Sequence, residues 1–187
     1  MSILEFFRKC LDQSYEAVMR SVEGLSAEEL SWRPTPGSMS IGFILWHYSR
    51  VLDLWPSRID GVPQLWEQGW AGKLGHATAD PKENGFGFSP EQLEAFRVPP
   101  ESVLLGYCQA SYSNLKEWLE GQREDAIEKA DVTIRAGTAI NLATLFQQLV
   151  WELNQHGGQI SYLRGMQRGI EDRYYSGPAL EAAVRGE

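Results

Sequence analysis

Apolar positions recur every three or four residues in four long stretches of the chain, a spacing that places them on one face of a helix. We therefore predict four long amphipathic helices, over about residues 2–24, 40–55, 100–121 and 141–169. Residues 132–134 (Val-Thr-Ile) are a weak strand signal, too short to build a sheet on. Four such helices without a convincing series of strands predict an all-α fold, a four-helix bundle.

The boundaries of these helices carry recognisable local signals. Ser2 with Glu5 reads as a capping box, and so does Ser26 with Glu29 ahead of a short turn. Pro56 marks a kink or a boundary near the end of the second helix. The polar stretch 124–137 either extends the third helix or forms a connection.

A long link, residues 61–99, separates the second helix from the third. It contains many glycines and prolines and little long-range periodicity, but Ser89 followed by Pro90 is a good start for a short helix. A connection of this length is usually functional or crosses from one end of a bundle to the other.

Length and composition agree with one globular domain over residues 1–187, with 43% hydrophobic and 22% charged residues. No apolar run is long enough to span a bilayer, and the N-terminus lacks the features of a signal peptide, so we expect no membrane partner and a cytoplasmic location. The two cysteines, Cys10 and Cys108, have no metal-type spacing and are expected to be buried free thiols.

Charge and aromatic content narrow the range of partners. The formal net charge is −8, and the basic residues are spread along the chain, so we expect no nucleic-acid partner. Four of the seven tryptophans, Trp46, Trp55, Trp66 and Trp70, lie close together in sequence. They predict either an aromatic core or an apolar wall around a pocket.

Two of the predicted helices carry residues that could bind a metal ion. Glu152 and His156 are four residues apart and share one helix face, and His47 lies on the second helix. Facing helices of a bundle can combine such side chains into a metal site, and imidazole with carboxylate suits zinc, nickel, iron or manganese. Gln148 and Gln159 lie about one turn to either side and are candidate hydrogen-bond partners of the ligands.

Spacing alone also permits a site without metal. A glutamate and a histidine four residues apart often form a hydrogen-bonded pair, and His47 alone fits a satisfied core or surface histidine. His76, in the link, is expected to be a solvated loop residue, although a flexible link could bring it to the site. The glycine pair 157–158 indicates close helix contact or a local kink.

The sequence resembles a known family at these positions. The run from His156 to Ile160, followed by Leu163-Arg164 and Gly169, resembles the closing helix of DinB-like (DNA-damage-inducible B-like) proteins. Residues 40–47 resemble the helix that presents the family's first histidine, and residues 85–105 resemble its link into the third helix.

The resemblance implies an up-up-down-down bundle, a homodimer, and a divalent metal bound by three histidines. His47 matches the first ligand and His156 the last, whereas Glu152 stands where the family has the remaining histidine. This difference implies either a two-histidine, one-carboxylate site or a lost site. Characterised relatives are metal-dependent transferases and isomerases that use thiols such as mycothiol or bacillithiol.

Three functions follow as alternatives. The first is a metal-dependent enzyme acting on a small molecule, an S-transferase or isomerase that uses a low-molecular-weight thiol, with zinc or nickel preferred over iron or manganese. The second is a non-catalytic metal-binding or stress-associated bundle. The third is a member of the family whose histidines and glutamate only hydrogen-bond to one another.

Overall fold

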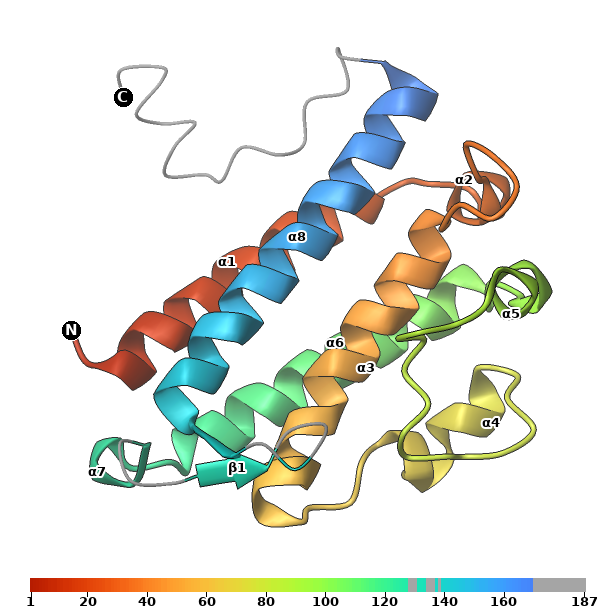
Figure 1. The fold of residues 1–187 in the computed structure, drawn as a ribbon. Coiled ribbons are helices and arrows are strands. Elements are labelled where there is room, and N and C mark those ends of the chain that lie inside the picture. Colours follow the sequence, from red (N-terminus) through yellow and green to blue (C-terminus); the bar gives the residue numbers. More distant parts are fainter. Residues whose placement is uncertain (128–130, 134–136, 138, 170–187) are drawn as a thin grey trace, which may run out of the picture.

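The computed structural model describes residues 1–127, 131–133, 137 and 139–169. Helices account for most of this part of the chain, as expected for an all-α protein, and four of them are long (Figure 1). The elements in chain order are α1 (Ile3–Val22), α2 (Ala27–Ser31), α3 (Ile41–Asp60), the π-helical turn η1 (Trp66–Trp70), α4 (Ala71–Lys73), α5 (Pro90–Ala95), α6 (Glu101–Glu120), α7 (Glu124–Ile127), β1 (Asp131–Thr133), β2 (Ala139–Asn141) and α8 (Leu142–Arg168).

Five helices, α1, α2, α3, α5 and α8, begin where a polar side chain accepts a hydrogen bond from an otherwise unpaired backbone N–H group, whereas α6 begins at Pro100 without such a cap. Ser40 accepts from the N–H of Phe43 at the start of α3, and Asn141 accepts from the N–H of Thr144 at the start of α8. Ser89 caps α5 inside the link, which confirms the short helix expected there. These caps explain why the starts of the elements could be predicted from local sequence.

The end of α3 differs from the prediction. The helix continues through Pro56 to Asp60 and ends at Gly61, which adopts a left-handed conformation with φ 69°. Pro56 therefore neither ends the helix nor marks its boundary. A left-handed residue after the last turn is the usual helix stop, and glycine adopts it without steric cost.

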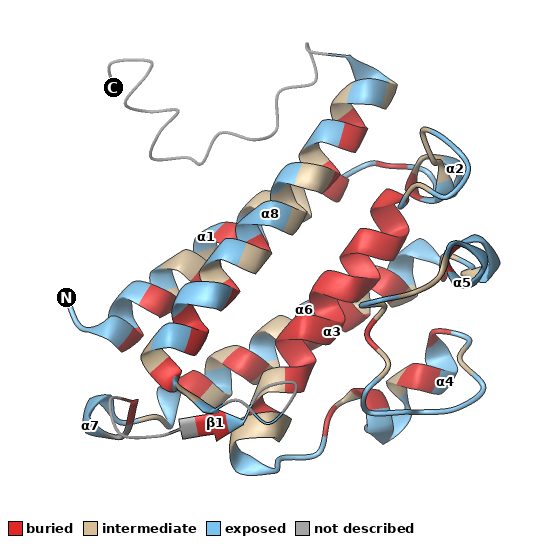
Figure 2. Cartoon of the chain, viewed as in Figure 1, coloured by how far each residue is buried: buried red, intermediate tan, exposed pale blue. Residues whose placement is uncertain are grey.

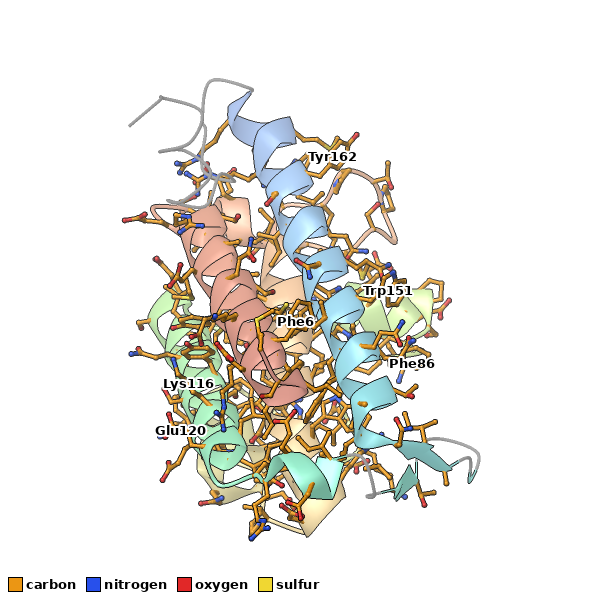
Figure 3. All side chains as sticks on the ribbon, turned by 90° about the vertical axis from the view of Figure 1, so that its left-hand side faces the viewer. Phe6, Phe86, Lys116, Glu120, Trp151 and Tyr162 are labelled. Carbon is orange, nitrogen blue, oxygen red and sulfur yellow. The ribbon has the colours of Figure 1, made fainter. Side chains whose placement is uncertain are left out.

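Helices α1 and α8 lie side by side and run in the same direction (Figures 1 and 3). Phe7 stacks on Phe146 near the start of each helix, with ring centroids 4.3 Å apart. Ser21 hydrogen-bonds to Ser161 towards the other end, over 3.1 Å. Gly157 faces α1 at this contact, where a Cβ would lie at an ordinary van der Waals distance of 3.6 Å from Val18.

Helices α3 and α6 form the second parallel pair. Arg50 in α3 contacts Tyr107 in α6, and Asp60 at the end of α3 accepts from Trp118 at the end of α6. The link explains this direction, because it returns the chain to the end of the bundle at which α3 began (Figure 1).

The two pairs run in opposite directions, which corrects the expected up-up-down-down topology. Arg8, near the start of α1, donates to the carbonyl of Leu119, near the end of α6. His47 in α3 faces α8. Residues near the end of α3 lie beside residues near the start of α8, and residues near the start of α3 lie beside residues near the end of α8. The order is therefore up-down-down-up. An up-up-down-down bundle needs two long crossovers, whereas here only the link between α3 and α6 returns the chain along the bundle.

A small hairpin precedes α8 and was not expected to form a sheet. Strand β1 pairs antiparallel with β2, with Val132 opposite Ile140. The weak strand signal is therefore real over residues 131–133, while Ile134 lies outside the described residues. The segment after α6 is a connection with its own short helix, α7, and does not extend α6.

Helix α3 is the centre of the molecule. Every residue from Ile41 to Leu54 is buried, beneath α6, α8 and the link (Figure 2). This stretch includes His47, Arg50 and Asp53, and buried polar groups are costly unless they find partners. The positions of those partners lead to the candidate site.

No helix in the described ranges is long and apolar enough to cross a membrane.

Exposed aromatic side chains are found on two of the long helices. Phe6, Trp151 and Tyr162 are exposed on the outer sides of α1 and α8 (Figure 3). The homodimer expected from the resemblance stays a prediction.

Candidate metal centre

The structure brings His47, Glu152 and His156 together, as the helix-face spacing predicted. His47 projects from the middle of α3, and the other two residues project from adjacent turns of α8. One ligand-type atom from each lies within 4.8 Å of the others. The cluster therefore forms because two antiparallel helices cross with these faces opposed.

Each histidine uses its Nδ1 atom in a hydrogen bond that points away from the cluster. His47 Nδ1 donates to the backbone carbonyl of Asn84, in the link. His156 Nδ1 donates to Gln159 Oε1 over 2.9 Å. A carbonyl oxygen can only accept, so these bonds place the proton on Nδ1 and leave each Nε2 with a free lone pair.

Both Nε2 atoms face the same carboxylate oxygen without hydrogen-bonding to it. Glu152 Oε1 is 3.7 Å from His47 Nε2 and 3.9 Å from His156 Nε2. These distances exceed those of N–H···O hydrogen bonds, which lie near 2.7–3.2 Å. In this tautomeric state, three acceptor atoms converge with no donor between them.

The imidazole of His156 is held in the neutral form by its surroundings. Burial lowers the pKa of His156 and outweighs the hydrogen bond to Gln159, which raises it; the nearby His47 lowers this pKa and Glu152 raises it, both by less. Neutral imidazole is the form that coordinates metals. The environment of His156 therefore favours the protonation state that a ligand needs.

The donor set fits a divalent ion. Two imidazole nitrogens and one carboxylate oxygen form the ligand set of known catalytic zinc and non-haem iron sites, which keep further positions open for water or substrate. In a tetrahedral zinc site with bonds of about 2.0–2.1 Å, ligand atoms are about 3.3 Å apart. The separations of 3.7 and 3.9 Å are slightly wider, and small side-chain movements would close them.

A cavity of about 250 Å³ opens directly beside the cluster. His47 and Glu152 form part of its wall, and the remainder is largely apolar. Trp55 lies in this wall, whereas Trp46 and Trp66 are fully buried in the core, so the tryptophans serve both predicted purposes. The other lining residues are Val51, Leu54, Arg58, Asn84, Phe86, Ile140, Leu145 and Gln148.

His76 lies outside the cluster and is not the solvated loop residue that we expected. Its ring stacks on Trp46 and meets the edge of Trp66, and its side chain is only 16% exposed. Its Nδ1 atom is 3.4 Å from Glu83 Oε1. The link packs over α3, and it holds His76 half-buried against aromatic rings instead of leaving it in solvent.

One of the two glutamines predicted to hydrogen-bond to the candidate metal ligands does so. Gln159 contacts His156, as expected, whereas Gln148 lines the cavity without a hydrogen bond to a ligand residue among those described. Asn84, the partner of His47, was missed because it lies in the link, 37 residues from His47. Its local signal was the turn-forming pair Asn84-Gly85, which indicates a turn but not what the turn touches.

Comparisons with known proteins agree with the fold. Residues 11–160 match the DinB superfamily, and the chain belongs to that family, which confirms the resemblance drawn from residues 40–47 and 156–169. A conserved protein from Enterococcus faecalis, known from its crystal structure, is similar with a TM-score of 0.76 and 24% identity, covering 89% of this chain and 97% of that one. No curated protein matches the chain.

Proposed function

We propose that this protein is a divalent-metal-dependent enzyme that binds zinc or nickel, or alternatively iron or manganese, through His47, Glu152 and His156. Its reaction would be the transfer or isomerisation of a small electrophilic molecule with a low-molecular-weight thiol. Membership of the DinB superfamily supports the general assignment.

One observation carries the proposal. The atoms His47 Nε2, His156 Nε2 and Glu152 Oε1 converge as acceptors, and none is hydrogen-bonded to another. A purely structural cluster would place a proton between at least two of them, at 2.7–3.2 Å. Acceptors that converge with no shared proton are stabilised by a cation, which argues for a metal ligand set over a hydrogen-bonded trio.

The residues around the cluster suit a small apolar substrate. A bound divalent ion would act as a Lewis acid and lower the pKa of a coordinated thiol. Val51, Leu54 and Trp55 provide apolar walls beside it, which would exclude water and bind the electrophile. Gln148 is one of the polar groups in the same cavity, with Arg58 and Asn84, and would orient the substrate by a hydrogen bond.

The carboxylate of Glu152 distinguishes this site from the three-histidine ligand set that the resemblance to DinB-like proteins implies. Glu152 would cancel one of the two positive charges of the ion, so the centre would carry one positive charge instead of two. A less positive centre withdraws less electron density from a bound thiol. We therefore propose a site that binds its metal firmly but acidifies the thiol less than a three-histidine site would.

A thiol-transfer assay tests the catalytic proposal. We expect the zinc- or nickel-loaded protein to accelerate the reaction of bacillithiol or mycothiol with 1-chloro-2,4-dinitrobenzene, followed by its absorbance. A chelator should reduce the rate to the uncatalysed value, and added metal should restore it. Stoichiometric metal without any acceleration would instead support the alternative, a non-catalytic metal-binding or stress-associated bundle.

A further inference from the structure

The link contacts the first candidate ligand through its backbone. Asn84 is buried, and its carbonyl accepts the hydrogen bond from His47 Nδ1. The side chain of the same residue turns the chain, because Asn84 Oδ1 accepts from the N–H of Phe86 over 3.0 Å. Asn84 therefore shapes the turn whose carbonyl holds the imidazole.

Gly85 allows the turn to lie against α3. Its φ is +84°, and a Cβ at this position would be 2.8 Å from Trp46 Cζ3 and 2.9 Å from Phe43 Cζ. Contacts that short are not tolerated, so any side chain would push the turn away from the helix. Gly87 has a similar φ of +78°, but nothing lies within 4 Å of its Cβ position. The two glycines share a conformation and differ in their closeness to α3.

Arg50 holds the chain just before the turn. This guanidinium is fully buried, three residues after His47 on α3. Its Nε donates to the carbonyl of Glu83 over 2.8 Å, and one terminal nitrogen donates to the carbonyl of Pro81 over 3.2 Å. The segment 81–85 is thus bound to α3 from both sides of Asn84, by a buried cation and by close packing.

We propose that segment 81–85 is a positioning element for the metal centre. The packing of Gly85 on α3 places the Asn84 carbonyl on His47, which keeps the proton on Nδ1 and directs Nε2 towards Glu152 and His156. The effect on metal affinity rests on the proposed function. The effect on the His47 tautomer does not, because it exists in the metal-free protein.

Matched glycine variants separate positioning from backbone strain. Gly85→Ala and Gly87→Ala both place a side chain at a positive φ, but only Gly85→Ala displaces the turn from α3. Zinc affinity, measured by competition with a chromophoric chelator, should fall about 10- to 100-fold in Gly85→Ala, the usual effect of losing a ligand's hydrogen-bond partner. Gly87→Ala should retain the wild-type affinity.

A metal-free measurement accompanies the titration. Long-range ¹H–¹⁵N correlation spectra report which ring nitrogen of His47 carries the proton. We expect the Nδ1–H tautomer in the wild type and in Gly87→Ala, and a mixture with Nε2–H in Gly85→Ala. Asn84→Ala removes the side-chain hydrogen bond to Phe86 but keeps the backbone carbonyl at position 84, so it should shift the zinc affinity and the tautomer in the same direction as Gly85→Ala, by less.

The outcomes distinguish the two proposals. A wild-type protein that binds none of zinc, nickel, iron and manganese refutes the metal site, and the tautomer spectra still decide the role of the segment. A folded Gly85→Ala with wild-type zinc affinity and an unchanged His47 tautomer overturns the positioning proposal. If Gly85→Ala does not fold, unchanged readouts in Asn84→Ala overturn it in the same way.

Discussion

The three histidines of the chain show how local surroundings decide what one residue type does. His47 and His156 each donate from Nδ1 to a carbonyl-type oxygen, so their Nε2 atoms converge on Glu152. His76 instead stacks between Trp46 and Trp66, away from the cluster. Identical side chains thus become candidate ligands or core residues according to their hydrogen-bond partners.

Burial of His76 predicts a dependence of stability on pH. Desolvation lowers the pKa of His76, with Arg50 acting in the same direction and Glu83 opposing both. The unfolded chain takes up this proton near the ordinary pKa of 6.5, while the folded protein takes it up only at lower pH. The stabilisation is complete above pH 6.5 and is lost as the pH falls towards the lowered pKa.

Urea unfolding of the metal-free protein between about pH 8 and pH 5 measures this effect. Below pH 6.5, the wild type should lose unfolding free energy more steeply than His76→Gln, by at most about 1.4 kcal/mol per pH unit for one proton. His156 is present in both proteins, so its own contribution cancels. If the free energy of unfolding falls equally steeply below pH 6.5 in the two proteins, the pKa of His76 is not lowered in the folded state.

Sequence reasoning found the ligand candidates because they obey helix periodicity. Glu152 and His156 are four residues apart on α8, so their shared face follows from helix geometry. The partner of His47 could not be predicted this way. Its carbonyl belongs to Asn84 in the link, and the path of an irregular segment depends on long-range packing such as that of Gly85 on α3.

Among the elements, α3 contains a fully buried ion pair, Arg50 with Asp53. Asp53 accepts hydrogen bonds from Arg50 and from the backbone N–H groups of Leu65 and Trp66, at 2.8 to 3.1 Å. Tyr107 in α6 donates to the same carboxylate over 2.8 Å. Since a buried ion pair is stable only when its hydrogen bonds are satisfied, this network connects α3, α6 and the start of η1.

Removing the Tyr107 hydroxyl tests the importance of that network. Tyr107→Phe should lower the free energy of unfolding by about 1–3 kcal/mol, because Asp53 and Arg50 each lose a buried partner. Tyr112→Phe is the matched control. Its hydroxyl donates to Asp12, which is only partly buried and keeps Lys116, so the loss should be below about 1 kcal/mol. Equal losses in urea unfolding would contradict the assignment.

Elements with strong local signals were predicted well, and those without them were not. Ser40 and Asn141 cap the starts of α3 and α8, and the regular spacing of apolar positions begins after each cap. The β1–β2 hairpin was missed because three-residue strands gain stability from pairing and tertiary contacts and have no periodicity to detect. The boundary expected at Pro56 was wrong, because the continuation of a helix past proline is decided by the packing around it, while the alternative of a kink there stays a prediction.

At the scale of the whole molecule, the direction of the helices places the site. The link returns the chain so that α3 and α6 are parallel, and α1 and α8 form the other parallel pair (Figure 1). Helix α3 then meets α8 in the antiparallel sense, which brings His47 opposite Glu152 and His156. The spacing of apolar residues predicts the helices but not their directions. The up-up-down-down order of helix directions that the DinB-like resemblance implied is wrong for this chain.

Membership of the DinB superfamily does not by itself assign a reaction. The central claim is therefore that the crossing of α3 and α8 forms a metal site. Two ligands come from one helix and one from the other, so removal of any one should weaken binding strongly. His76, buried in the same molecule but outside the cluster, provides a histidine control.

The most direct test is the metal content of the protein after loading with zinc or nickel and removal of free ions, measured by elemental analysis. We predict about one equivalent per chain in the wild type and in His76→Ala, and a loss of most of it in His156→Ala, because of these two histidines only His156 belongs to the cluster. Absence of stoichiometric metal in the loaded wild type, or equal retention in the two histidine variants, would contradict the account.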